Sequence, residues 1–380
     1  MRRLVVLLLA ALAAAVLIAP AAGAAERKVP FGFLGTMADG AFVEEPSIDL
    51  DAETSAMVRT GVERLRLAVY WDQAQPDPAT APDFAATERI VGAAARRGIP
   101  VFLTIVAAPA WARKDPSRHW SPPADPAAYG RFAGQVAARF GSRGTFWSEH
   151  PELPRVPVRD YQIWNEPAGF APGEPSVFWD DKGEPYQQRY VAMLRAARQQ
   201  VRAADPAANI VLAAFFGRAW QTMPKLLKAG ADGLFDQFAL NIFTARPGDL
   251  VRAARKTRKA MRRVGARRVP VVFTEVSWTA SRGRLREGTE LQTYDLTPKK
   301  QARRLVAAMT RLAAARKSLK IAGAFWYTWL SRYSSPTYRF DYAGLRRLDG
   351  GRVVTTRAQS AFRGVARTLE GCAKRAIRDC

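Results

Sequence analysis

Short apolar runs alternate along the chain with longer stretches in which apolar residues recur every three or four positions. The first pattern is typical of buried strands, and the second is typical of helices that pack one face on a core. Eight such pairs follow one another. The expected strands are 29–34, 63–70, 99–105, 158–163, 209–216, 235–243, 269–274 and 321–329. The expected helices are 52–60, 83–97, 126–140, 185–204, 222–229, 248–264, 298–316 and 358–369.

A helix between successive strands indicates parallel pairing, because a parallel pair needs a crossover connection. The run 99–105 is almost wholly apolar, as a strand covered on both faces requires. Eight units predict an α/β fold with a single (β/α)8 TIM barrel, which we expect over residues 26–369. The alternative is an open doubly wound sheet, but Gly32 and Gly35 do not fit its glycine-rich phosphate turn.

The N-terminus has the pattern of a secretory signal peptide. Two arginines precede an apolar run over 4–18, and small residues lead to Ala25. We therefore predict a signal peptide over 1–25 and a secreted or cell-envelope-associated protein. The run is shorter than the about twenty residues of a membrane span, and an uncleaved N-terminal anchor is the alternative.

Cysteine and histidine are scarce. Both cysteines, Cys372 and Cys380, lie in a predicted C-terminal tail over 370–380, where they could close one small loop in an oxidising compartment. With two cysteines and two histidines, we expect no protein metal site and no cofactor.

Lysine and arginine outnumber the acids by 58 to 34, which gives a net charge of +24. Such a field attracts anions. For a secreted protein an acidic glycan, a wall polymer or anionic lipid is a better partner than nucleic acid, and no stable protein partner is inferred. The alternative is that the charges are spread over solvated helix faces, as in the run 252–268.

Two expected strands end in a glutamate. One leads into Trp164-Asn165-Glu166-Pro167, and 269–274 leads into Glu275. In a parallel barrel the carboxyl ends of the strands meet at one mouth. Glycoside cleavage needs one carboxylic acid to protonate the leaving oxygen and one carboxylate to attack or stabilise the anomeric carbon. The pair predicts this chemistry; the alternative is two solvated loop acids.

These motifs resemble the retaining glycoside hydrolases of clan A, and families 5 and 39 in particular. The Trp-Asn-Glu-Pro motif and Thr274-Glu275-Val276-Ser277-Trp278 carry the likeness. Gly61-Val62-Glu63-Arg64-Leu65-Arg66 is similar to the second strand of that clan, with its active-site arginine at Arg66. The likeness extends over residues 30 to 365.

The resemblance implies a role for each residue. Glu166 would be the acid/base and Glu275 the nucleophile, held ionised by Arg66. Asn165 would bind the hydroxyl beside the scissile carbon. The implied activity is hydrolysis of β-glycosidic bonds in a polysaccharide or oligosaccharide, anionic glycans included, by double displacement.

One position departs from the clan. The end of its sixth strand often carries His-x-Tyr, whose hydroxyl orients the nucleophile, whereas this chain has Asn241-Ile242-Phe243. Phe243 has no hydroxyl to donate, so Asn241 is the candidate substitute. Rings that cover sugar faces are also expected. The candidates are Trp71, Trp111, Trp278 and, at the end of strand eight, Trp329.

The leading alternative function is a catalytically impaired barrel that binds a polysaccharide of the cell envelope. Phe243 and the basic surface favour it, and the retention of two glutamates argues against it. An esterase would need a nucleophilic Ser or Cys beside a His, and the sequence has no Gly-x-Ser-x-Gly elbow.

Overall fold

The computed structural model describes residues 27–167, 179, 186–216, 218–288, 291 and 293–371. The predicted signal peptide, most of the Gly- and Pro-rich loop 168–181 and both cysteines lie outside these residues. Among the described residues, no helix combines the length and the apolar character needed to cross a membrane.

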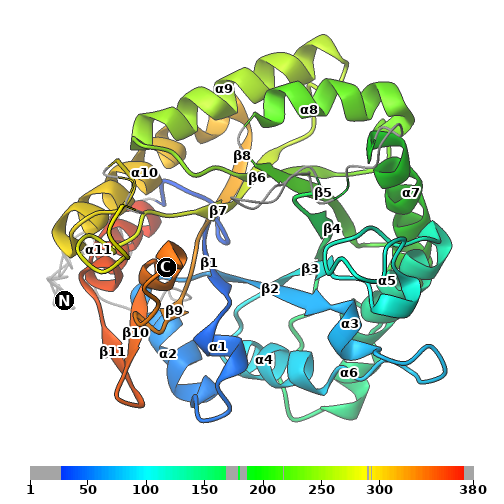
Figure 1. Cartoon of the computed structure of the whole chain (residues 1–380), viewed down its shortest axis with the longest axis horizontal. Coiled ribbons are helices and arrows are strands. Elements are labelled where there is room, and N and C mark those ends of the chain that lie inside the picture. The colour runs from blue at the N-terminus through cyan, green and yellow to red at the C-terminus, as the bar shows by residue number, and fades with distance from the viewer. Residues whose placement is uncertain are drawn as a thin grey trace, which may run out of the picture.

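Eight parallel strands close into one barrel in sequence order, and the last pairs with the first (Figure 1). The predicted (β/α)8 barrel is confirmed, and the open doubly wound sheet is wrong. The strands are β1 (Leu34–Ala38), β2 (Arg64–Tyr70), β3 (Val101–Val106), β4 (Asp160–Asn165), β5 (Asn209–Phe216), β6 (Gln237–Asn241), β7 (Val271–Val276) and β8 (Ile321–Trp326).

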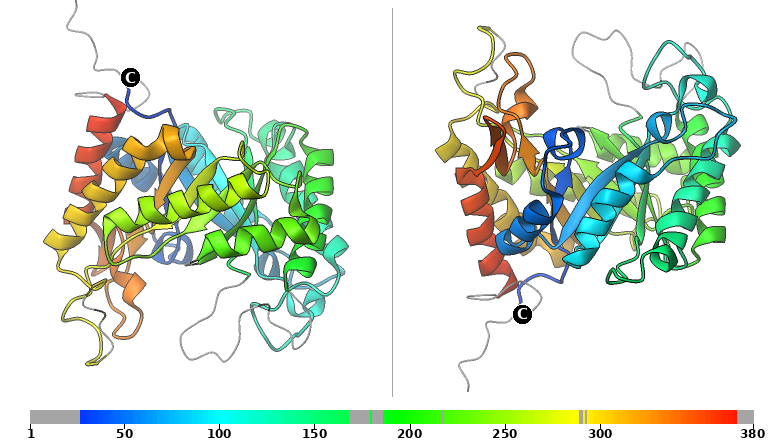
Figure 2. Two further views of the ribbon diagram at one scale, coloured as in Figure 1. Left: turned by 90° about the horizontal axis from the view of Figure 1, so that it is seen from above. Right: turned by 90° about the horizontal axis from the view of Figure 1, so that it is seen from below.

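The main helices form a ring outside the strands (Figures 1 and 2). Each lies within three residues of its predicted bounds. They are α2 (Leu50–Thr60), α4 (Ala85–Arg96), α5 (Pro126–Phe140), α7 (Tyr186–Ala204), α8 (Ala219–Leu226), α9 (Pro247–Arg263), α10 (Pro298–Leu319) and α11 (Arg357–Glu370).

Smaller elements decorate the loops and were not predicted. Three short helices follow strands or helices of the first half: α1 (Ala41–Glu44), α3 (Trp71–Ala74) and α6 (Thr145–Glu149). After β8 the chain adds a three-stranded sheet. It consists of β9 (Leu330–Ser331), β10 (Arg346–Asp349) and β11 (Arg352–Thr355), with β10 in the middle.

Local sequence explains where the helices begin. The Asp125 side chain accepts from the backbone N–H groups of Ala127 and Ala128, and Pro126 fills the first helical position of α5. Thr297 and Pro298 repeat this arrangement at the start of α10. In each case a side-chain oxygen satisfies a free N–H, and proline loses nothing at a position without a helical partner.

Three strands differ from their predicted bounds in ways that matter for the site. Strand β1 begins at Leu34, where the prediction ended, because Gly32 makes a turn at φ +82°. Strand β7 begins after Pro270 and runs to Val276, so Glu275 lies within it. Strand β8 ends at Trp326, three residues before Trp329.

The lower part of the barrel lumen is closed by a buried apolar layer that includes Phe102 and Phe325. The Arg64 guanidinium lies over both rings, 5.5 and 5.3 Å from their centres, and pairs with Asp160 at 2.6 Å. Arginine can cover an aromatic ring and bind a carboxylate at once. The lumen is thus closed at the amino ends of the strands, and a ligand has access from their carboxyl ends.

Helices α5 and α7 approach closely because α5 carries glycine where they meet. A Cβ added at Gly130 would lie 2.9 Å from the backbone of Ala196. From α7, the Tyr190 hydroxyl donates to the Ile163 carbonyl at 2.9 Å and accepts from the Ala213 N–H at 2.7 Å. The contact thus supports β4 and β5 below Glu166.

Substitution of Gly130 by alanine is predicted to destabilise the protein by about 1–3 kcal/mol, because the new methyl meets backbone that cannot move aside. Gly364, in α11, is the matched control, since nothing lies within 4 Å of its added Cβ. Gly364→Ala should stabilise by about 0.5–1 kcal/mol. Chemical denaturation measures the change in the free energy of unfolding for both variants. Changes of the same sign would contradict the close contact at Gly130.

Candidate active site

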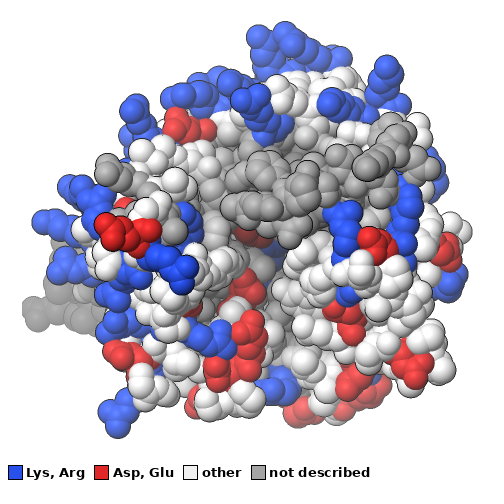
Figure 3. Space-filling view, in the orientation of Figure 1, with Lys and Arg blue, Asp and Glu red and all other residues white. Residues whose placement is uncertain are grey.

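Glu166 and Glu275 face one cavity of about 510 Å³ at the carboxyl ends of the strands. In Figure 3 the molecule is hollowed near its centre, and Asp and Glu atoms lie in the hollow and below it. The rest of the wall comes from loops after β6, β7 and β8. It consists of Phe243, Thr244, Ala245, Leu291, Thr293, Tyr294, Tyr327, Tyr338, Arg339 and Phe340.

The backbone turns sharply where β4 ends. Trp164 and Glu166 have φ of +66° and +49°, in the left-handed region that side chains disfavour. The Glu166 N–H donates to the Ala214 carbonyl at 3.0 Å, and the Trp164 ring is fully buried. These contacts hold the unfavourable conformation and direct the Glu166 side chain into the cavity. Such backbone strain concentrates at functional sites.

Arg66, on β2, holds Glu275, on β7, across the barrel. Its Nη1 donates to Glu275 Oε1 at 2.8 Å, its Nη2 to Asn165 Oδ1 at 3.0 Å and its Nε to Thr104 Oγ1 at 3.0 Å. The Arg66 side chain is only 1% exposed. A guanidinium engaged on three sides cannot swing away, so Glu275 keeps a fixed cationic partner.

Asn241 continues the network to the second glutamate. Its Nδ2 donates to Glu166 Oε1 at 2.8 Å and to Asn165 Oδ1 at 3.2 Å, and its Oδ1 accepts from Thr274 at 2.8 Å. Hydrogen bonds therefore join Glu275 to Glu166 through Arg66, Asn165 and Asn241. A guanidinium only donates hydrogen bonds, so the Asn165 Oδ1 must face Arg66. The Asn165 Nδ2 is then left to donate to another group.

The two carboxyl groups differ in proton affinity. Burial and the charge of Glu275 raise the pKa of Glu166 to about 7, and the hydrogen bond from Asn241 opposes this only in part. Burial also raises the pKa of Glu275, against the opposing charge and hydrogen bond of Arg66. Since Arg66 contacts Glu275 directly, a single proton shared by the pair favours Glu166. The cavity thus presents a proton donor and a carboxylate.

Asp39 adds a third carboxylate to the barrel mouth, directly after β1. It accepts from the Tyr327 hydroxyl at 2.5 Å. Burial raises the pKa of Asp39, and its charge in turn raises the pKa of Glu275. The sequence carries the same strand-end signal here as at the two glutamates. It was missed because the first strand was expected to end at Leu34 rather than at Ala38.

The structure corrects three of the predicted sugar-binding rings. Trp71, Trp278 and Trp329 are each at most 1% exposed. Their indole N–H groups are also engaged: that of Trp329 donates to Glu53 at 2.8 Å and that of Trp278 to the Thr244 carbonyl at 2.6 Å. A buried ring offers no face to a sugar, so these residues support loops and helices instead.

Other apolar side chains are exposed near the mouth. Tyr338 and Leu291 line the cavity and are 53% and 56% exposed. Trp111, which was predicted, is 40% exposed but does not line this cavity. Phe243 does line it, half-buried against Phe340 at 4.9 Å between ring centres. Tyr338 is therefore the most exposed ring in the described cavity wall, and no pattern in the sequence distinguished it.

The described residues include no group of three or more His, Cys, Asp or Glu side chains placed to hold a metal ion. His119 lies 3.4 Å from Asp72 and 3.2 Å from Arg113, and His150 lies 3.1 Å from Glu152. Both histidine side chains are more than a third exposed and lie in loops.

No protein-family model and no curated protein matches this sequence. Solved structures do match its fold. A family 39 glycoside hydrolase from the gut symbiont Bacteroides cellulosilyticus WH2 is 17% identical, with a TM-score of 0.61 over 90% of this chain. The match spans 64% of that enzyme's length.

Two further structures are a glucosidase from Croceicoccus marinus and a family 1 β-glucosidase from Thermotoga maritima. The first is 16% identical, with a TM-score of 0.63 over 91% of this chain and 70% of the other. The second is 13% identical, with a TM-score of 0.59 over 90% and 99%. The chain therefore has the barrel fold of family 39 and family 1 glycoside hydrolases.

Proposed function

We propose that the protein is a retaining glycoside hydrolase that cleaves β-glycosidic bonds with Glu166 and Glu275. The observation that carries the proposal is the hydrogen-bonded connection between the two carboxyl groups, only one of which contacts an arginine. Paired carboxyl groups of unequal proton affinity are what an acid and a nucleophile require. The fold shared with glycoside hydrolases supports the same assignment.

In the first step, the Glu275 carboxylate attacks the anomeric carbon while Glu166 transfers its proton to the glycosidic oxygen, so that the leaving sugar departs neutral. A glycosyl ester on Glu275 results. In the second step, Glu166, now ionised, takes a proton from water. The water oxygen attacks the anomeric carbon, and Glu275 leaves as a carboxylate. Both groups return to their starting protonation states.

The neighbours of the pair have supporting roles. Arg66 disfavours protonation of Glu275 and so keeps it nucleophilic. The Asn165 Nδ2, left as a donor by the contacts of its oxygen, can bind the sugar hydroxyl beside the reacting carbon. Asn241 positions Glu166, whereas the tyrosine that the resemblance implied at Phe243 would have oriented the nucleophile Glu275.

The substrate we propose is a polysaccharide or oligosaccharide with a neutral sugar at the cleavage point. Asp39 adds a third carboxyl group close enough to Glu275 to raise its pKa, and further negative charge there disfavours a uronate. The cation in the cavity wall, Arg339, is paired with Asp295 at 2.5 Å. The anionic partner expected from the net charge therefore fits another surface better.

We retain a secreted location as a proposal, on the signal peptide pattern alone.

A carbohydrate-binding barrel without turnover is the second candidate, and Phe243 is the observation that favours it.

The first experiment separates the enzyme from the binding protein. Sugar release from a panel of β-linked polysaccharides should fall about 10²–10⁴-fold in Glu166→Gln, and about 10⁴-fold or more in Glu275→Gln. Glu152→Gln, at an exposed loop acid, is the control and should act as wild type.

Binding of one polysaccharide without release by the wild-type protein would refute the enzymatic proposal. In that case Phe243→Tyr tests whether the missing hydroxyl alone accounts for the lost turnover.

The pH dependence follows from the raised pKa of Glu166. An acid must be protonated to donate, so kcat/KM should fall as the pH rises through about 7. Glu275→Gln removes the charge that favours the protonated form and should lower the pKa of Glu166 below about 7. Carboxyl NMR titration of Glu275→Gln and of Glu152→Gln measures this; equal Glu166 titrations in the two variants would contradict the coupling.

The exposed Tyr338 ring is predicted to cover a sugar face at the cavity rim. Tyr338→Ala should raise KM for an oligosaccharide about 3- to 10-fold with a smaller effect on kcat, because the ring contacts the ligand away from the glutamates. Tyr338→Phe keeps the ring and is the matched control. Steady-state kinetics decides; a phenylalanine variant as weak as the alanine variant would assign the effect to the hydroxyl.

A further inference from the structure

The positive charge is concentrated in one part of the chain. Residues 27–165 contain 16 lysines and arginines and 16 acids, so their net charge is zero. Residues 218–320 contain 24 lysines and arginines and 7 acids, a net charge of +17. An even distribution would give this stretch about a quarter of the chain's +24. The cations are therefore concentrated over 218–320, where α9 carries many of them on its solvated face.

This stretch forms one side of the barrel, because successive βα units are neighbours in space. Helices α8, α9 and α10 pack side by side there (Figure 1). In Figure 3, Lys and Arg atoms follow this edge, whereas the Asp and Glu atoms gather over the opposite half. We call the outward cations of α9 the basic flank: Arg252, Arg255, Lys256, Lys259, Arg262 and Arg263.

The six side chains recur every three or four residues and so form a continuous strip along a 17-residue helix. The one acid of the helix, Asp249, pairs with Arg252 at 2.8 Å. Among the described residues, no acid lies within ion-pair distance of Arg255, Lys259 or Arg263. Their charges are available to a ligand.

Helix stability does not account for this strip. Arg262 and Arg263 interact favourably with the carboxyl end of the helix. Arg255 and Lys259 lie in its middle and are four residues apart, where like charges destabilise a helix. A strip whose middle cations weaken the helix, and in which Arg255, Lys259 and Arg263 have no acidic partner among the described residues, fits a surface that binds an anion.

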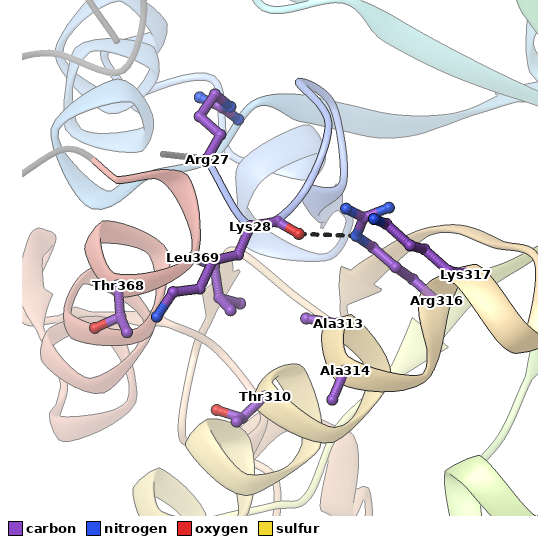
Figure 4. A pocket seen from close by; sticks show the side chains of 9 residues that line it. All are labelled: Arg27, Lys28, Thr310, Ala313, Ala314, Arg316, Lys317, Thr368 and Leu369. Atoms are coloured by element: carbon purple, nitrogen blue, oxygen red, sulfur yellow. Dashed lines mark hydrogen bonds between the residues drawn. The ribbon is translucent and has the colours of Figure 1, made fainter. Parts of the chain in front are cut away.

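The cations continue beyond the flank, away from the catalytic mouth. Barrel helices run opposite to the strands. The carboxyl ends of α9 and α10 therefore lie at the end of the barrel away from the catalytic mouth. A hollow of about 720 Å³ opens there beside α10 and α11 (Figure 4). Its described lining includes Arg27, Lys28, Arg316 and Lys317 and no acid, although Arg27 also pairs with the buried Glu63. Arg316 also donates to the Lys28 carbonyl at 2.8 Å.

We propose that the basic flank binds a linear acidic polysaccharide and holds the protein on it with the catalytic mouth free. Arginine forks match carboxylate groups, and a strip of regularly spaced cations suits a repeating anion. A membrane surface fits less well, because an interfacial helix needs an exposed apolar face. Of the exposed large apolar residues, only Val306 lies on α8, α9 or α10 within the described residues.

Binding to immobilised polygalacturonate at about 0.15 M salt tests the proposal without reference to turnover. The flank variant Arg255→Glu/Lys259→Glu/Arg263→Glu should bind at least 10-fold more weakly than wild type. The matched control makes the same charge change at three exposed arginines of the neutral half, Arg89→Glu/Arg97→Glu/Arg143→Glu. It should lose less than 3-fold. Circular dichroism melting verifies that both variants fold.

Three outcomes would overturn the proposal. Equal losses in the two triple variants would mean that net charge alone governs binding. Tighter wild-type binding to phosphatidylglycerol vesicles or to double-stranded DNA than to polygalacturonate would assign the flank to another partner. Absence of wild-type binding would mean that the strip is only a solvated surface. Loss of binding together with unchanged sugar release would separate the flank from the active site.

Discussion

The ion pair between Arg66 and Glu275 is the interaction on which the barrel mouth depends. Both side chains are buried, and a buried charge without a partner is costly. The Arg66 guanidinium is satisfied by hydrogen bonds to Glu275 and Thr104. Its Nη2 donates to the side-chain oxygen of Asn165 and so fixes the orientation of that amide. One side chain from β2 thereby sets the positions of groups on β4 and β7. The rigid strands and the arginine fork together define where a substrate can react.

The same pair explains why two glutamates in one cavity behave differently. Burial raises the proton affinity of both, so desolvation alone would give two similar acids. Arg66 contacts Glu275, whereas Glu166 receives only the neutral amide of Asn241. The difference therefore comes from hydrogen-bond partners on other strands. Residue type and burial alone do not produce this difference in proton affinity. The proposed roles of acid and nucleophile follow from it.

The sequence predicted the fold and the central polar residues because both depend on strand periodicity. A glutamate after an apolar run must lie at the mouth of a parallel barrel, and this identified Glu166 and Glu275. The same rule failed for Asp39, since Gly32 turns the chain and moves the first strand five residues along. Trp329 was misjudged for another reason. Its buried indole N–H donates to Glu53, 276 residues away, and no local pattern encodes that contact.

Composition gave the size of the positive charge, and the barrel topology determines its location. Because neighbouring units in sequence are neighbours in space, a stretch with a net charge of +17 becomes one continuous wall. The mouth carries three carboxyl groups instead, of which Glu275 is the one that contacts Arg66. An acidic polymer is therefore attracted to the flank and repelled from the cavity, and a neutral sugar can enter without competing with it. The proposed function and the proposed role of the flank together imply that one molecule holds an anionic matrix and acts on a different chain within it.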